Sequence, residues 1–163
     1  SEKIGLQAAN LGSPAGGPED DMLHFGQLVD DHDAIDALAD KLISAARTAA
    51  VTAAQCRALL RVFTRQLRTH IDAETILLAD DAATRGNAAF HAEVRAFNAD
   101  FAELTAGWRS YLLHWSEGAI LADRTGFMQQ TTDMMTALKL RLERESSVIY
   151  PLAIKAGLIS PFL

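Results

Sequence analysis

Apolar residues recur at alternating intervals of three and four along four successive stretches of this chain, and this spacing constrains the fold more than any other feature. In an α-helix the spacing places the apolar side chains along one face, which has to be buried against other helices. We therefore predict helices over about 18–49, 52–84, 87–121 and from 123 onwards. Their apolar faces are marked by Phe25, Leu28, Ile35, Leu42, Phe63, Leu67, Phe90, Phe97, Trp108, Met135, Leu138 and Leu142.

Start and stop signals agree with these helices. Pro18, followed by two acidic residues, is typical of a first helical turn, and Thr52 is a good N-cap for the second helix. The segment "RGN" ends the second helix, and the third is predicted to continue without a break despite Gly107. Pro151 is expected to bend or end the fourth helix.

The length of 163 residues is typical of one domain, and the scarcity of valine, isoleucine and tyrosine favours an all-α fold. The connections between the predicted helices are too short for crossovers. We therefore predict an up-down-up-down antiparallel four-helix bundle over residues 19–163. Residues 1–18, which include "GSPAGGP", are predicted to be an N-terminal arm.

Charge and composition argue against several classes of partner. The formal net charge of -6 and the absence of any lysine-arginine cluster argue against nucleic-acid binding. No apolar run approaches the ~20 residues that cross a membrane, and the N-terminus does not resemble a secretory signal. A single cysteine, Cys56, cannot form an internal disulfide. We expect a cytoplasmic protein without nucleic-acid or membrane partners.

Five ionisable residues lie on the predicted apolar faces, namely His32, His70, Glu74, Arg141 and Glu145. In the predicted topology the start of the first helix meets the ends of the second and fourth, so these residues converge at one height. Buried ionisable groups have to be paired, hydrogen-bonded or bound to a metal. Two imidazoles and two carboxylates suit divalent iron, manganese or zinc, and a salt-bridged pair of helices is the alternative.

The predicted third helix contains two histidines, which lie at different distances from the polar group. His91 lies near its start, at the bundle end of the polar group, and is interpreted either as a metal ligand or as an exposed residue of the first turn. His114 lies 23 residues further along, which is ~35 Å in a helix and too far for a shared site.

These residues resemble the hemerythrin-like domains, also called HHE cation-binding domains, which are four-helix bundles holding a non-haem di-iron centre. The resemblance covers residues 20 to about 155 and is carried by "DDHDAID", "HIDAE" and "RLERESSVIYP". It implies that one iron would be bound by His32, His70, Glu74 and Glu145. The second iron would need histidines on the third and fourth helices, where this chain has Arg141 in place of the fourth-helix histidine.

Arg141 leaves two outcomes open. A guanidinium has no lone pair to donate and repels a metal ion, so its expected role is to neutralise Glu145 or Glu74. Either the His32/His70 half holds a single metal ion, or Arg141 replaces the metal altogether.

Three functional hypotheses follow. The first is a hemerythrin-like protein that binds at most one metal ion, iron before other divalent metals, and senses or binds a small oxidant or gas. The second is a metal-free interaction or regulatory module, with a protein partner or a second copy of the chain. An oxidative enzyme is the least supported of the three. The sequence contains no phosphate-binding loop, nucleophile elbow or catalytic cysteine motif, and we predict no catalytic residues.

Overall fold

A computed structural model describes residues 24–75 and 88–161 of the chain, and these residues are helical almost throughout. The described residues contain no strand, apart from an isolated bridge between His24 and Ser160. The prediction of an all-α protein is therefore confirmed. No helix in the described part of the chain is both long and apolar enough to span a membrane.

The first two helices agree with the sequence prediction over most of their described lengths, but the first begins later than predicted, because His24 is its extended N-cap residue. Helix α1 spans Phe25–Arg47 and helix α2 spans Ala53–Thr75. Thr52 caps α2, because its hydroxyl accepts from the Gln55 N–H at 3.1 Å while the Gln55 side chain accepts from the Thr52 N–H at 2.8 Å. The predicted helix start at Pro18 and the "RGN" break lie outside the described residues.

The predicted continuous third helix is wrong. Helix α4 spans Ala88–His114, and a separate short helix, α5, spans Glu117–Ala122. Ser116 caps α5, its hydroxyl accepting from the Ala119 N–H at 3.2 Å. The break lets Trp115 be buried, with its indole N–H donating to the Gln130 side chain at 3.0 Å. This packing outweighs continuation of the helix.

The last helical region is continuous but irregular. Helix α6 spans Arg124–Arg144 and is capped by Asp123, which accepts from the Gly126 N–H at 2.8 Å. A π-helical turn, η1, follows over Glu145–Ile149, and α7 spans Tyr150–Lys155. Pro151 lies in the first turn of α7 and does not end the helix.

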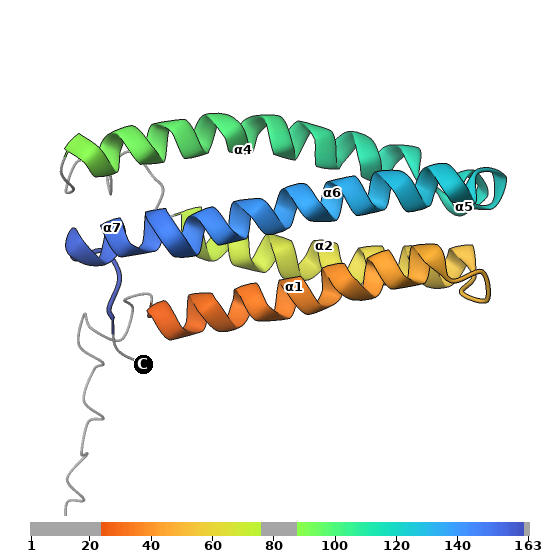
Figure 1. Ribbon diagram of the computed structural model, residues 1–163, viewed down its shortest axis with the longest axis horizontal. Helices are drawn as coiled ribbons and strands as arrows, with labels where there is room; N and C mark the ends of the chain where they lie inside the picture. Colours follow the sequence, from red (N-terminus) through yellow and green to blue (C-terminus); the bar gives the residue numbers. More distant parts are fainter. Residues whose placement is uncertain (1–23, 76–87, 162–163) are drawn as a thin grey trace, which may run out of the picture.

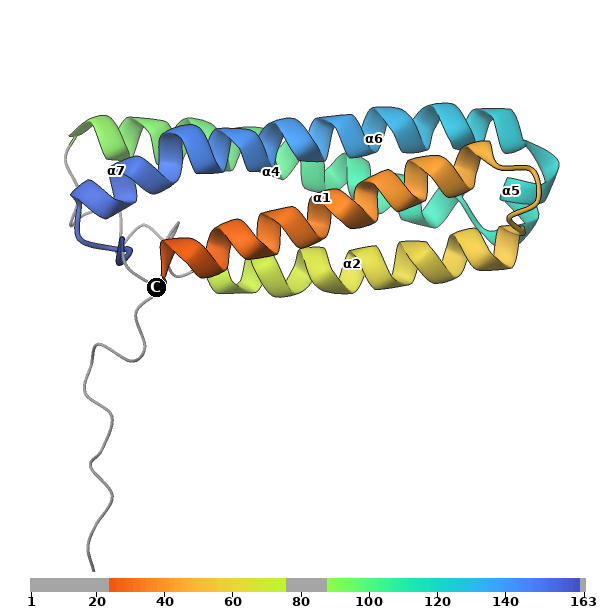
Figure 2. The same cartoon turned by 60° about the horizontal axis from the view of Figure 1, so that its bottom comes forward.

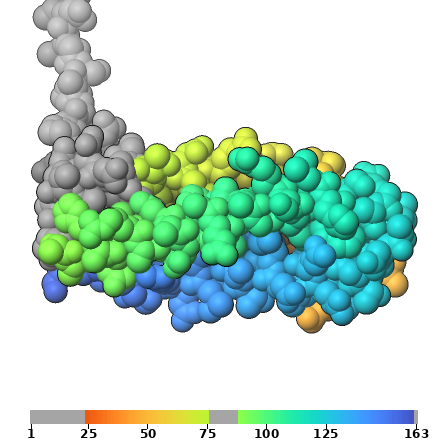
Figure 3. Space-filling view, turned by 90° about the horizontal axis from the view of Figure 1, so that it is seen from above, coloured from red at the N-terminus to blue at the C-terminus, as the bar shows by residue number. Residues whose placement is uncertain are grey.

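The long helices lie lengthwise beside one another (Figure 1, Figure 2). Helix α1 packs against α2 and α6, while α4 packs against α6 and η1. The space-filling view shows α4 across one face, with α2 along one side of it and α6 along the other (Figure 3).

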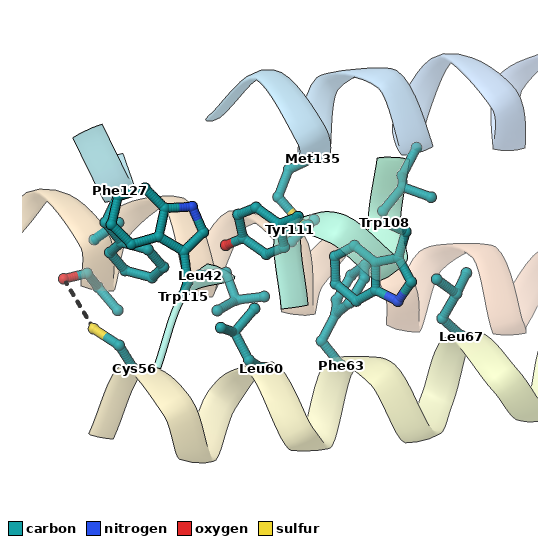
Figure 4. Packing of buried hydrophobic residues seen from close by; sticks show 14 of the residues in the cluster. Leu42, Cys56, Leu60, Phe63, Leu67, Trp108, Tyr111, Trp115, Phe127 and Met135 are labelled. Atoms are coloured by element: carbon teal, nitrogen blue, oxygen red, sulfur yellow. Dashed lines mark hydrogen bonds between the residues drawn. The ribbon is translucent and has the colours of Figure 1, made fainter. Parts of the chain in front are cut away.

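Within the described residues, the buried apolar side chains form two clusters. The larger includes Phe63, Trp108, Trp115 and Phe127, shown in Figure 4. The smaller includes Leu28, Phe90, Val94, Phe97, Ile149 and Tyr150. On α1, Leu28 belongs to the smaller cluster and Ile35 to the larger, so His32 lies between them. Polar residues therefore separate two parts of the core.

Candidate metal centre

Four predicted ligands form a buried group between the two clusters. His32 comes from α1, His70 and Glu74 come from α2, and Glu145 is the first residue of η1. Their exposed fractions are 7%, 1%, 1% and 0% in that order. One ligand atom of each lies within 4.8 Å of those of the other three. We call these residues the His2Glu2 group.

The ligand atoms face a common point. The Nε2 atoms of His32 and His70 lie 3.1 Å apart. The Glu145 Oε2 atom lies 2.9 Å from the first and 3.1 Å from the second, and Glu74 Oε1 lies 3.2 Å from the His70 Nε2. Bonds of about 2.1 Å to an ion place neighbouring octahedral donors about 3.0 Å apart. The observed separations therefore fit donors that surround one ion.

Both imidazoles turn their Nδ1 atoms away from this point. The Nδ1 of His32 lies 2.9 Å from the Ser146 hydroxyl. The Nδ1 of His70 lies 3.8 Å from the Asp31 carboxylate, too far for a hydrogen bond. Histidine ligands to metals use one ring nitrogen for the ion and direct the other to a carboxylate, carbonyl or water. The orientation of both rings fits metal binding.

Arg141 lies beside the group and pairs with its carboxylates, as the sequence predicted. Its Nε donates to Glu145 Oε1 at 2.8 Å, and a terminal nitrogen lies 3.9 Å from Glu74 Oε2. The guanidinium carbon lies 4.3 Å and 3.6 Å from the ring centres of Phe97 and Phe101 on α4. These rings hold the charge close to the carboxylates in a desolvated position.

Tyr150 is the residue of the site that sequence analysis missed. Its hydroxyl lies 2.9 Å from the Nε2 of His32 and 3.3 Å from Glu145 Oε2, and it donates to Glu74 Oε1. The tyrosine was visible in the sequence as part of the "YP" pair. In a regular α-helix, however, two residues five apart point about 140° away from each other, so the sequence did not place Tyr150 beside Glu145.

The π-turn η1 explains how Glu145 and Tyr150 reach the same point. The Tyr150 N–H donates to the carbonyl of Glu145, five residues earlier. This wider turn brings the two side chains closer in direction than an α-helical turn does. Both side chains are fully buried. Isolated π-turns inside α-helices occur frequently at functional sites.

Burial and hydrogen bonding oppose each other at the ionisable groups. Burial alone would lower the pKa of His70, but hydrogen bonds to Glu145 and Glu74 outweigh it and raise the pKa to about 10. Burial would raise the pKa of Glu145, yet hydrogen bonds from the two histidines hold it well below its usual range. Burial also raises the pKa of Glu74. At neutral pH and without a metal, His70 therefore carries protons on both ring nitrogens and is positively charged.

Two buried atoms of the group have no hydrogen-bond partner. They are the Nδ1 of His70 and the Oε2 of Glu74. A buried carboxylate oxygen without a partner is costly. A terminal nitrogen of Arg141 lies 3.9 Å from Glu74 Oε2, too far for a hydrogen bond. The chemistry of the donors and this unsatisfied oxygen both fit a bound cation.

His91, the fifth predicted ligand, is not part of this group. It is half-buried near the start of α4. Among the residues that the structure describes, the His2Glu2 group draws its members from α1, α2 and η1, and none from α4. At this height α4 contributes the aromatic rings that cover Arg141. A role for His91 as a ligand stays a prediction.

A surface cavity of about 390 Å³ lies beside the group, between α1 and α6. His32 and Ser146 line its inner side. The remaining lining residues carry more negative than positive charge and are Asp33, Asp36, Lys139, Leu142 and Glu143. An acidic cavity of this kind raises the local concentration of cations. The cavity therefore gives His32 one opening towards the surface among the described residues.

Comparison of the chain with protein-family models, with curated proteins and with solved structures finds no match. The hemerythrin-like resemblance therefore depends on the residues themselves.

Proposed function

We propose that the protein is a hemerythrin-like, antiparallel up-down-up-down four-helix bundle that binds one metal ion, iron before manganese or zinc, in the His2Glu2 group. The observation that carries this proposal is the convergence of His32 Nε2, His70 Nε2 and Glu145 Oε2, mutually 2.9 to 3.1 Å apart in the buried interior. Mixed imidazole and carboxylate ligands suit these metals.

Charge balance supports a cation at this position. Glu74 and Glu145 carry two negative charges when both are ionised, and two neutral histidines add none. A divalent ion balances the pair, whereas Arg141 alone balances half of it. In the metal-free state the proton on His70 supplies the missing charge, consistent with its raised pKa. The second negative charge of the carboxylates is therefore balanced either by a metal ion or by the additional proton on His70.

Arg141 supports a single ion over a pair. Its guanidinium occupies the side of Glu145 opposite His32, because it binds Oε1 while His32 contacts Oε2. A permanent cation at that place repels a second metal ion and offers it no lone pair. We infer that the chain has kept one half of a di-iron site and replaced the other half by a side chain.

The bound ion would supply a coordination site for a small oxidant or gas, such as oxygen, nitric oxide or peroxide. With one divalent ion, both carboxylates and Arg141, the site carries one net positive charge, which favours an anionic ligand. The Ser146 hydroxyl, 2.9 Å from the Nδ1 of His32, holds that ring in orientation.

The proposal is tested by metal content. Purified protein would be incubated anaerobically with ferrous iron, freed of unbound metal and analysed by mass spectrometry for metal per chain. We expect one ion in the wild type and little in His70→Gln. His114→Gln is the matched control, because His114 is exposed and is the last residue of α4, a helix that contributes no member to the His2Glu2 group. A wild type without metal, or an equal loss in both variants, would contradict the proposal.

The second candidate is a metal-free regulatory or interaction module that binds a protein partner or a second copy of the chain. It is favoured by the 2.8 Å ion pair between Arg141 and Glu145, which links consecutive turns of α6 and η1 without an ion. This candidate predicts no metal in the wild type under the same conditions, with an unchanged helical fold by circular dichroism.

A further inference from the structure

We propose that Tyr150 is a fifth ligand of the bound ion and that its phenolate oxygen makes the site selective for ferric iron. This inference depends on the proposed function, because it adds a donor to the same site. It assigns to Tyr150 a direct role in binding the metal.

The position of the hydroxyl is that of an additional ligand. In an octahedral site each donor has four neighbours about 3.0 Å away and one donor opposite. The Tyr150 oxygen contacts three of the four His2Glu2 atoms, at 2.9 Å from His32 Nε2, at 3.3 Å from Glu145 Oε2 and by a hydrogen bond to Glu74 Oε1. The oxygen therefore faces the same point as the four ligands already described.

Ordinary hydrogen bonding does not account for all three contacts. A phenol has one hydrogen and can donate it to one acceptor at a time. Donation to Glu74 leaves the oxygen lone pairs of Tyr150 facing the Glu145 carboxylate at 3.3 Å. The single hydroxyl hydrogen then serves Glu145 only weakly, and an ion ligated by both oxygens would hold them together more strongly than this shared hydrogen.

The backbone supports the same assignment. Tyr150 reaches the site through the π-turn η1, whose defining hydrogen bond joins Tyr150 to Glu145. The Tyr150 ring also stacks on His32, with ring centres 5.3 Å apart and an angle of 30° between their planes. Phe25 packs edge-on against the same Tyr150 ring, with ring centres 6.3 Å apart. Packing and the π-turn therefore fix the phenol in one orientation, as a ligand requires.

A phenolate changes which ion the site prefers. Two carboxylates and one phenolate carry three negative charges, which a trivalent ion balances and a divalent ion does not. Hard anionic oxygens favour hard cations, and ferrous iron becomes ferric by passing one electron to dioxygen from air. The hydroxyl proton of Tyr150 is released to solvent as the phenolate binds. Arg141 adds one positive charge beside Glu145 and leaves room for one anionic exogenous ligand.

The test uses the colour of a phenolate-iron bond. Purified protein would be loaded with ferrous iron, exposed to air and measured by visible absorption together with iron content. The chain has two tyrosines, so each can be replaced separately. Tyr111→Phe is the matched control, because Tyr111 is buried and hydrogen-bonds Thr131 at 2.6 Å in the larger apolar cluster, away from the site.

We expect a phenolate-to-iron charge-transfer band in the wild type and in Tyr111→Phe, and its loss in Tyr150→Phe at equal iron content. Persistence of the band in Tyr150→Phe would overturn the inference. An iron-loaded wild type without the band would overturn the inference about Tyr150 and leave the proposed function standing. A wild type that binds no iron would overturn the proposed function itself. Resonance Raman of the wild type with ring-deuterated tyrosine tests the bond without any variant, and no shift of bound-tyrosine vibrations would also count against it.

Discussion

The two oxygens of Glu145 have different partners: Arg141 Nε donates to Oε1 at 2.8 Å, while His32 Nε2 lies 2.9 Å from Oε2. One carboxylate therefore joins a permanent cation on one side to a histidine on the other, whose Nε2 faces the common point of the His2Glu2 group. This division is the structural basis for expecting one ion where the hemerythrin-like resemblance implies two.

Replacing Arg141 by histidine should strengthen metal binding. The change removes a positive charge and adds a nitrogen donor. At an effective dielectric constant of about 20, a unit charge about 5 Å from a divalent ion contributes about 7 kcal/mol of repulsion. Relief of even a small part of this repulsion should lower the Kd by at least about tenfold. Titration of the metal-free protein with ferrous iron measures it. Arg144→His is the control, because Arg144 pairs with Asp100 at 2.8 Å on the surface. An equal gain in both variants would rule out the proposed role of Arg141.

Stability of the metal-free protein should fall as the pH rises above neutrality. The pKa of His70 is raised from 6.5 to about 10, so its stabilising contribution is complete below pH 6.5 and is lost as the pH rises to about 10. Urea unfolding at several pH values between 6 and 10, with a chelator present, measures this decline. His70→Gln should show a flatter profile over the same range. A wild-type stability that is constant or rises over this range would contradict the raised pKa.

Metal binding should release a proton at neutral pH. His70 carries a proton in the metal-free state, because its pKa is about 10, and a ligand histidine has to be neutral. The metal affinity should therefore increase with pH between 6 and 9. Calorimetry in two buffers with different ionisation enthalpies gives the number of protons released. Absence of any buffer dependence would show that His70 is already neutral before the ion binds.

Ser146 should matter for metal affinity more than for folding. Its hydroxyl lies 2.9 Å from the Nδ1 of His32 and fixes the orientation of that ring. Loss of such an outer contact typically weakens metal affinity by about 10- to 100-fold, so Ser146→Ala should fall in this range. Ser147→Ala is the matched control, because Ser147 is the exposed neighbour. Equal affinities in the two variants would show that the Ser146 contact does not orient His32.

Much of the helical structure was predictable, because apolar spacing is a local signal repeated over many turns. Leu28, His32 and Ile35 are buried on α1 as that spacing predicts. The break between α4 and α5 was missed because the apolar pattern continues through Trp115, which concealed the N-cap signal of Ser116. Whether the helix continues there depends on where the Trp115 ring packs, and that is a tertiary contact.

The candidate site was predictable to the extent that polar residues interrupt apolar faces. Helix periodicity and the predicted up-down topology place His32, His70 and Glu74 on inward faces at the same end of the bundle. The structure brings these side chains together. Tyr150 was missed because a π-turn changes the periodicity on which the prediction depended. The stacking of Arg141 against α4 likewise depends on how helices pack, which spacing within one helix does not specify.

The central claim is that the His2Glu2 group binds one ion, and anomalous diffraction from crystals of the iron-loaded protein tests it most directly. We predict a single anomalous peak within bonding distance of His32 Nε2, His70 Nε2 and the Glu74 and Glu145 carboxylates. Iron-loaded crystals with no peak there, or with the peak at another site, would contradict the account.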